Sequence, residues 1–422
     1  EAAADLLRYL RDHQASAADH LRTLSTYSAD DHMALDASAR RHLELTQATG
    51  SGPTSRSLLQ VLDRTVTAMG GRTLRRWIQL PLLSLEEIHD RQEAVAELVG
   101  SALLRGDLRE RLREVSDMER LTSRAATGTC NPRDLAQLRT SLLAVPALIE
   151  ALSEVGSAPL LWLRESLDPL PDVAELLCRA LSEEVPINLR DGGVIRPGFN
   201  AELDELRDAA SGGKEGIARL EAEERERTGI QNLKVGYNSV FGYYIEVSKS
   251  NLSRVPSDYR RKQTTANGER FLTPKLKEFE AAVLGAEERA AQLEATLFDG
   301  VRQATAAESA RLLALAGALA RLDALAALAE TASVYGYVRP VADRSGLLEI
   351  VGGRHPVVEA AGLEPFVPND ITLGAEDQKL MLITGPNMAG KSTYLRQTAL
   401  IVLMAQIGSF VPADSARIGL VD

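Results

Sequence analysis

The sequence predicts a multidomain, mainly helical protein in which a small β-containing module lies between two long helices, followed by the first part of an α/β domain. Three observations predict this fold. Residues 1–185 carry apolar side chains at helical spacing, whereas residues 233–247 alternate apolar and polar side chains as strands do. Near residue 385 a glycine-rich loop stands between an apolar run and a helical run. The length of 422 residues suits two to four domains.

The bulk composition is that of a folded protein, with 45% hydrophobic and 25% charged residues. The net charge of −11 does not indicate a nucleic-acid binder, although one local basic surface can still bind phosphates. Cys130 and Cys178 have no second Cys or His at metal-ligand spacing, which indicates ordinary thiols. No run of ~18 uncharged apolar residues predicts a membrane span. Residues 1–5 resemble the middle of a helix, so we expect a piece of a longer protein.

Helix boundaries can be predicted at several positions. Asn131 followed by Pro132 is typical of an N-cap and a first helical residue. A charged helix is predicted over residues 200–229, with a break near residues 211–213, Ser-Gly-Gly. No proline occurs between Pro274 and Pro340, which predicts about 60 helical residues in one long helix or two nearly collinear ones.

Two regions predict strands. Leu233, Val235 and Tyr237 alternate with polar residues, as do Tyr243, Ile245 and Val247, with turn residues between the two runs, so a β-hairpin is expected. Towards the C-terminal end, short apolar runs at 348–351 and 380–383 predict strands. A helix is then predicted from about Gly390 to Ile407, ending at Gly408.

The sequence Gly-Pro-Asn-Met-Ala-Gly-Lys-Ser at residues 385–392 matches the pattern G-x-x-x-x-G-K-[ST] in full. Such glycines let backbone N–H groups point at a phosphate, and the N-terminus of the following helix adds partial positive charge. Lys391 would reach the β and γ oxygens of a nucleotide, and the Ser392 hydroxyl would ligate Mg²⁺. The context of strand, loop and helix favours a phosphate-binding loop over a glycine-rich turn. Phe366, taken alone, is more typical of a core residue than of a nucleotide platform.

A second candidate site is a basic segment at residues 249–275. Seven lysines and arginines against two acidic residues give it a net charge of +5, and aromatic residues are interleaved with them. The basic residues are Lys249, Arg254, Arg260, Arg261, Lys262, Arg270 and Lys275. With polar neighbours such as Asn267 they suit contacts to a sugar–phosphate backbone. From composition alone, a solvated charged surface is an equally good interpretation.

Taken together, these features resemble the bacterial MutS mismatch-repair family. The segments that carry the resemblance are residues 384–399 around the loop, together with 70–77, 131–135, 235–244 and 353–359. The resemblance covers nearly the whole chain, and this combination of segments is highly specific.

The resemblance implies a domain assignment. Residues 1–30 would end a connector domain, 31–213 would form the first part of the core and lever, 214–274 a clamp, 275–337 the second part of the lever, and 338–422 the N-terminal part of a P-loop ATPase domain of the ABC type. The implied full-length protein is an ATP-dependent clamp that binds mispaired DNA.

The resemblance also implies site residues and partners. ATP or ADP, with Mg²⁺ on Ser392, would be bound by Gly385, Pro386, Asn387, Met388, Ala389, Gly390, Lys391, Ser392 and Thr393, with Phe366 stacked on adenine. The backbone of double-stranded DNA would be contacted by Lys249, Arg260, Arg261, Lys262, Asn267 and Arg270. We further expect a homodimer in the full-length form and a MutL-type partner. The expected location is cytoplasmic and associated with the nucleoid, with no membrane.

Two departures from the family pattern limit the functions that we expect of this chain. No Phe-x-Glu, the family's mismatch-reading motif, occurs in the sequence. The run at 418–422 ends in Asp without a following Glu, so we interpret it as a peripheral strand rather than the strand that carries the catalytic acid. We therefore expect no complete catalytic site and no ATP turnover by this chain alone.

Two other functions remain open. One is a MutS-family DNA clamp specialised for recombination intermediates, which an N-terminal Phe-x-Glu would exclude. The other is an SMC-like coiled-coil ATPase, which is less favoured because its coiled coil follows the phosphate loop, whereas here the long helices precede it.

Overall fold

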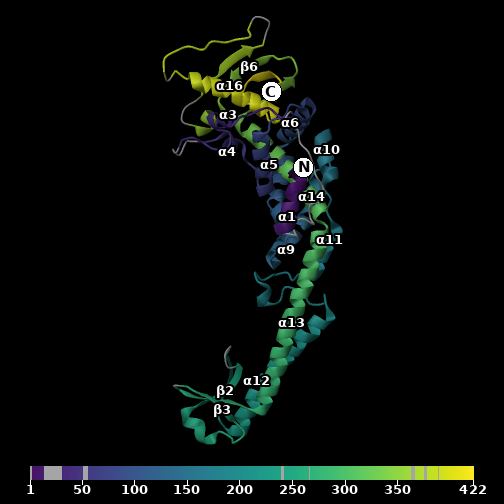
Figure 1. Ribbon diagram of the computed structural model, residues 1–422, viewed down its shortest axis with the longest axis vertical. Helices are drawn as coiled ribbons and strands as arrows, with labels where there is room; N and C mark the ends of the chain where they lie inside the picture. The colour runs from purple at the N-terminus through teal and green to yellow at the C-terminus, as the bar shows by residue number, and fades with distance from the viewer. Residues whose placement is uncertain are drawn as a thin grey trace. The chain divides into compact units, whose positions relative to one another are not determined.

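The computed structural model describes residues 2–13, 31–50, 56–238, 242–265, 267–362, 366–374, 378–387 and 389–422. The chain divides into two compact units (Figure 1). The first unit comprises Glu1–Cys130, Gln137–Ala174 and Thr305–Asp422. The second comprises Asn131–Ala136 and Glu175–Ala304.

The first unit is mainly helical. Its helices are α1 (Ala2–His13), α3 (Ala37–His42), α4 (Leu58–Leu62), α5 (Ala68–Gln79), α6 (Leu85–Gly100), α7 (Ala102–Leu112), α8 (Met118–Ala126), most of α9 (Pro132–Ala151), α10 (Ala158–Ser166), α14 (Ser309–Tyr335), α15 (Pro356–Ala361) and α16 (Lys391–Gln406). The central helix is α14, which packs against α5, α6, α7, α8 and α10. By length and composition α14 could cross a membrane, but 78% of its most apolar stretch is buried. It is therefore the core helix of this unit.

A four-stranded sheet completes the first unit. Its strands β5 (Val341–Asp343), β6 (Leu348–Gly353), β7 (Asn369–Leu373) and β8 (Ser415–Gly419) lie in the order β5-β8-β6-β7. The predicted strand at 348–351 is confirmed within β6. Of the run at 418–422, only Ile418 and Gly419 lie in a strand. The interpretation of that strand as peripheral is wrong, because β8 lies inside the sheet, parallel to β5 and antiparallel to β6. That it does not carry the catalytic acid stays a prediction.

The strand predicted at 380–383 is also wrong. These residues form no strand, and Leu380 and Leu382 are 89% and 86% exposed. An apolar run becomes a strand only when a neighbouring strand takes up its backbone hydrogen bonds, and no described strand pairs with this one.

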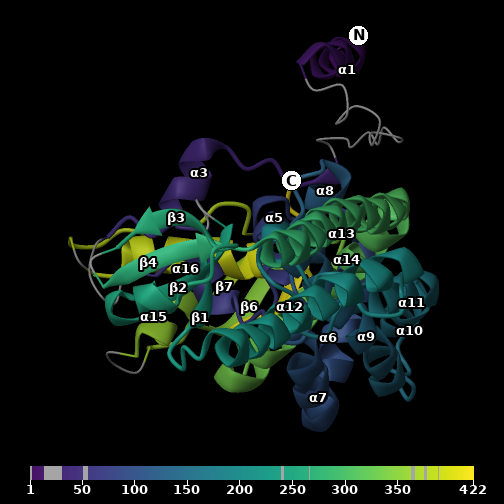
Figure 2. The same ribbon diagram turned by 90° about the horizontal axis from the view of Figure 1, so that it is seen from below.

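The second unit holds a sheet packed on two helices. Strands β1 (Lys234–Asn238), β2 (Gly242–Ser248), β4 (Gly268–Leu272) and β3 (Arg260–Thr264) are all antiparallel and lie side by side in that order (Figure 2). The predicted hairpin is confirmed in β1 and β2, where Val235 pairs with Ile245. Ile245, Val247 and Phe271 form one core with Ile217 and Leu220 of α12 (Ala201–Thr228) and Leu276 and Val283 of α13 (Pro274–Ala307).

The predicted break in the helix at 211–213 is wrong, because α12 runs without interruption from Ala201 to Thr228. Gly213, within the predicted break, and Gly216, one turn later, serve close packing instead. A Cβ atom at Gly213 would lie 2.4 Å from Cγ2 of Val283, and one at Gly216 would lie 2.6 Å from Cε1 of Phe279. Small residues at these positions let α12 approach α13 within the second unit.

The remaining boundaries agree with the sequence. α9 begins at Pro132, and Asn131 and Asp134 hydrogen-bond each other's backbone N–H groups at 2.7 and 3.0 Å. The helical stretch after Pro274 consists of two helices, α13 and α14, with Glu308 between them. The short helices α11 (Pro171–Ala180), η2 (Leu189–Asp191) and η3 (Lys249–Arg254) complete the described elements.

Candidate functional site

The glycine-rich loop leads directly into α16. Gly390 is the N-cap of this helix and has φ of 85°, a left-handed conformation that glycine adopts without a steric penalty. Lys391, the first helical residue, turns its side chain back, so that Nζ donates to the carbonyl oxygens of Gly385 at 2.5 Å and Pro386 at 2.6 Å. The amine thus lies on the loop that precedes it. Ser392 is exposed, Thr393 is half-buried, and Met388 lies outside the described residues.

The far end of α16 is fixed in the core. Leu400, Ile401 and Leu403 are buried, and the helix gives way to Gly408 with φ of 84°, as predicted. The Gln406 amide group donates to the carbonyl oxygens of Leu82 and Val421 at 3.0 and 2.9 Å, and its oxygen accepts from the Val421 N–H at 3.0 Å. These bonds hold the helix at its C-terminal end while its N-terminal end carries the loop.

Two side chains tie α16 to the strand that follows Phe366. The Tyr394 hydroxyl donates to the Asp370 carbonyl oxygen at 2.8 Å, and the Asn369 amide donates to Gln397 Oε1 at 3.4 Å. Both strand residues belong to β7, and Phe366, which is half-buried, lies three residues before its first residue. Sequence reasoning missed Tyr394 and Gln397. Their spacing of three and six residues after Lys391 was the available signal, since side chains three or four apart share a helix face.

A buried histidine lies close to the same helix. His355 is the N-cap of α15, and its Nδ1 accepts from the Val358 N–H at 3.3 Å. Burial, and to a smaller extent the positive charge of Arg396 on α16, lower the pKa of His355 to about 4. The ring is therefore neutral at physiological pH.

The donors for a metal ion are incomplete in this region. Within the described residues, no group of three or more His, Cys, Asp or Glu side chains is placed to hold a metal ion. The Ser392 hydroxyl can supply one oxygen ligand of the kind Mg²⁺ takes, and Mg²⁺ usually keeps several water ligands and shares the substrate's phosphates. The loop therefore fits a phosphate group and one side of a Mg²⁺ shell.

The basic residues of the second unit lie on different sides of its sheet. Arg260 pairs with Leu272, and Gln263 pairs with Arg270 across β3 and β4, so Arg260 and Arg270 point to one face. Arg261 pairs with the core residue Phe271 and therefore points to the opposite face, at the sheet edge. Lys262 lies in the β-bulge between Arg261 and Gln263 and is exposed. Lys249 and Asn267, both exposed, are joined by a backbone hydrogen bond of 3.3 Å.

Acidic residues offset part of this positive charge. Arg270 lies 3.1 Å from Glu246 and stacks over the Tyr244 ring at 4.1 Å, while Arg261 lies 3.3 Å from Glu269. Lys275 lies 2.6 Å from Glu223. Glu246 and Glu223 fall outside residues 249–275, so the net charge of the segment did not include them. Arg260 has no carboxylate within ion-pair distance in the described part of the chain, and it is exposed.

The two candidate sites therefore belong to separate units. The loop, α16 and β7 form one in the first unit, and the sheet of β1 to β4 carries the other in the second. The structure brings the loop residues together on a helix N-terminus. It places only Arg260 and Arg270 of the predicted basic residues on a shared sheet face.

Comparison with known proteins gives matches to two family models. The model of MutS domain III matches residues 38–329, and that of MutS domain V matches residues 381–422. Among curated proteins, those named "DNA mismatch repair protein MutS" from Symbiobacterium thermophilum and Desulforamulus reducens are 52% and 50% identical over 100% of this chain and 48% and 49% of their own lengths. The protein of that name from Myxococcus xanthus is 52% identical, over 100% of this chain and 48% of its length. The chain thus spans about half the length of the curated relatives it matches.

Proposed function

This chain belongs to the MutS family, and from that premise we propose that it acts in DNA mismatch repair, as part of an ATP-dependent clamp on double-stranded DNA. Two separate features support the proposal. The first unit has a glycine-rich loop with the G-x-x-x-x-G-K-[ST] pattern on a helix N-terminus, and the second has Arg260 and Arg270 on one face of its sheet.

The nucleotide would be bound by residues 385–393. Backbone N–H groups of the loop and the N-terminus of α16 attract phosphate oxygens, and the Lys391 amine supplies a full positive charge. Ser392 would hold Mg²⁺ together with phosphate oxygens and water, and Mg²⁺ would neutralise charge on the phosphates. Phe366 would contact adenine, since the Tyr394–Asp370 hydrogen bond ties the strand after Phe366 to α16.

The DNA backbone would be contacted from the outer face of the β1 to β4 sheet. Of the two arginines on this face, Arg260 would make the stronger contact, because Glu246 offsets the charge of Arg270 and no carboxylate among the described residues offsets that of Arg260. The other predicted residues would contribute less to DNA binding or would contact the DNA from the margins of this face. They are Lys249, Arg261, Lys262, Asn267 and Arg270. Binding through phosphates carries no sequence information, so matched and mismatched duplexes would bind this chain alike.

The wider assignments are proposals from the family. We propose the end of a connector domain at 1–30, core and lever at 31–213 and 275–337, a clamp at 214–274 and the N-terminal part of an ATPase domain at 338–422. We propose ATP hydrolysis, a homodimer, a MutL-type partner and association with the nucleoid for the full-length form, because the curated relatives are about twice the length of this chain.

The single observation that carries the proposal is the placement of Lys391, with its amine on the carbonyl oxygens of the loop that it follows. The test is titration of the chain with a fluorescent ADP analogue in the presence of Mg²⁺. Lys391→Ala should weaken binding about 10- to 150-fold, the effect of losing a charge-assisted hydrogen bond. Lys379→Ala, at an exposed lysine before the loop, is the matched control and should bind as the unaltered chain does. Equal affinity of the Lys391→Ala and unaltered chains would refute the assignment.

A further inference from the structure

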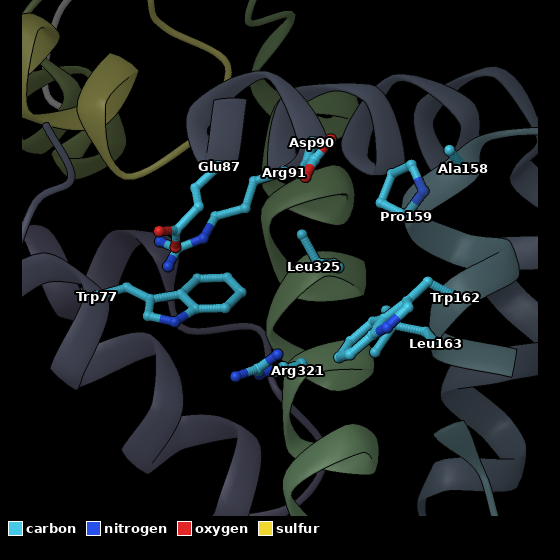
Figure 3. A pocket seen from close by; sticks show the side chains of 10 residues that line it. All are labelled: Trp77, Glu87, Asp90, Arg91, Ala158, Pro159, Trp162, Leu163, Arg321 and Leu325. Carbon is cyan, nitrogen blue, oxygen red and sulfur yellow. The ribbon is translucent and has the colours of Figure 1, made fainter. Parts of the chain in front are cut away.

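A groove of about 510 Å³ opens between α5, α6, α10 and α14 in the first unit (Figure 3). Its floor is apolar, formed by the buried side chains of Leu163 and Leu325. Trp77 and Trp162 stand on opposite sides of it, and they are the only two tryptophans in the sequence. The groove shares no lining residue with the phosphate loop or with the basic sheet face.

Trp162 is 52% exposed. Covering a large, half-exposed apolar ring with a second apolar surface is favourable, because it removes apolar surface from water. Tryptophan is also enriched among the residues that contribute most to protein–protein binding. The volume of the groove lies within the range of about 300–1,000 Å³ that is typical of binding pockets. These properties favour an occupant with an apolar group of that size.

The two arginines of the groove differ in how they are bonded. Arg91 stacks over Trp77 at 3.9 Å and donates from Nη1 to the Ile407 carbonyl oxygen at 3.1 Å. Burial lowers the pKa of Arg91 to about 9, so the group stays charged at neutral pH, with Glu87 of the same helix favouring the charged form. Arg321 is exposed, lies 5.5 Å from the Trp162 ring, and has no carboxylate at ion-pair distance in the described ranges.

The charges of the rim define the chemistry of the occupant. Arg321 offers an unmatched cation beside the apolar floor, so an anion next to an apolar group is complementary to it. On the α6 side the rim carries Glu87 and Asp90, both exposed, which would repel a polyanion such as a nucleoside triphosphate. A single carboxylate placed on the Arg321 side avoids this repulsion.

We propose that this groove is a docking site for a segment of a partner protein that presents a large apolar side chain, preferably aromatic, next to a carboxylate. The apolar side chain lies between Trp77 and Trp162 on Leu325, and the carboxylate pairs with Arg321. A second copy of this chain and a nucleotide are the alternative occupants that the experiment separates.

Intrinsic fluorescence provides the test, because both tryptophans line the groove and no others contribute. The probes are three capped peptides, acetyl-Ser-Glu-Phe-Ser-amide and its versions with Ala in place of Phe or Lys in place of Glu. The first should shift the emission saturably to shorter wavelength. The Ala version should bind about tenfold more weakly or worse, since it lacks the apolar ring, and the Lys version about threefold more weakly.

Charge reversal distinguishes docking from a structural role of Arg321. Arg321→Glu should reverse the preference, so that the Lys peptide binds more tightly than the Glu peptide. The matched control is Arg289→Glu, at another exposed arginine, which should keep the original order. A Trp77→Phe variant leaves Trp162 as the sole reporter and should retain the emission shift.

Several outcomes would overturn the proposal. One is equal affinity for the Glu and Lys peptides, and another is no saturable binding of any peptide below about 5 mM. A third is self-association in sedimentation that Trp162→Ala abolishes, because the occupant would then be a second copy. The last is an emission shift with ATP, but with no peptide, in a Lys391→Ala background, which would identify a nucleotide.

Discussion

The carboxylate of Asp323, in the middle of α14, accepts hydrogen bonds from both the backbone N–H and the hydroxyl of Thr67, at 2.8 and 2.6 Å. It also accepts from the Val66 N–H at 3.0 Å. Asp323 is fully buried, and burial raises the pKa of its carboxyl, while the hydrogen bonds from Thr67 and Val66 act in the opposite direction. The core helix thus holds the start of α5 through one buried charge.

Removing this carboxylate should destabilise the first unit strongly. Asp323→Ala leaves the buried N–H and hydroxyl of Thr67 and the half-buried N–H of Val66 without their acceptor, and should lower the free energy of unfolding by about 3–5 kcal/mol. Urea denaturation followed by circular dichroism measures this. Asp208→Ala, at an exposed aspartate on α12, should change stability by less than about 0.5 kcal/mol. A loss for Asp323→Ala no larger than that of this control would contradict the assigned role.

Two adjacent glycines of α12 should respond in opposite directions to the same substitution. Gly212→Ala should stabilise the helix by up to about 1 kcal/mol, because nothing lies within 4 Å of the added Cβ. Gly213→Ala should destabilise by about 1–3 kcal/mol, because its Cβ would meet Val283 of α13. Thermal denaturation of both variants gives the comparison, and Val283→Ala should partly rescue Gly213→Ala. Stabilisation by both substitutions would show that α12 and α13 are not in close contact here.

The buried histidine predicts a dependence of stability on pH. His355 has a pKa of about 4 in the folded protein and about 6.5 when unfolded, so the unfolded chain binds more protons between these values. The stability is therefore complete above pH 6.5 and is lost as the pH falls towards 4, by up to about 3 kcal/mol for the difference of 2.5 units.

The measurement for this prediction is the urea midpoint between pH 4.5 and 7.5. His355→Asn keeps a capping oxygen but does not titrate, so it should flatten the pH dependence over this range. His42→Asn, at an exposed histidine, should leave the dependence unchanged. An equally steep loss of stability in the His355→Asn chain would assign the effect to other groups.

The ion pair of Arg270 predicts that an acidic residue restrains DNA binding. Glu246→Gln removes the carboxylate 3.1 Å from Arg270 and should strengthen binding to duplex DNA. Arg260→Ala should weaken it and reduce the log–log salt slope by about one unit. Titrations at several salt concentrations measure both, with Glu202→Gln as the control at an exposed glutamate of α12. If Glu246→Gln gained no more than this control, Arg270 would lie away from the DNA.

The features that could be predicted from the sequence are those fixed by nearby residues. The start of α9 depends on the Asn131–Asp134 capping pair, and the ends of α16 depend on Gly390 and Gly408. The hairpin of β1 and β2 depends on alternation within fifteen residues. In each case the interaction that decides the structure lies within the segment itself.

The features that were mispredicted depend on distant partners. Gly212 and Gly213 indicate a break in isolation, but Val283, seventy residues after Gly213, makes Gly213 a point of close helix packing. Similarly, the apolar run at 380–383 needs a neighbouring strand, and the positive charge of Arg270 is offset by Glu246, its paired residue on the adjacent strand β2. Sequence patterns contain no information about such neighbours unless the topology is already known.

The anchoring of α16 at one end implies a gradient of local stability along the helix. Its last two turns are buried and bonded through Gln406, whereas Ser392, Leu395 and Arg396 in the first turns are exposed. Amide hydrogens of residues 400–405 should therefore exchange with deuterium only on global opening, while those of the first turns exchange by local fraying. The loop would then be attached to the less stable end of α16. It could therefore change conformation around an anion while the buried C-terminal turns of the helix stay in place.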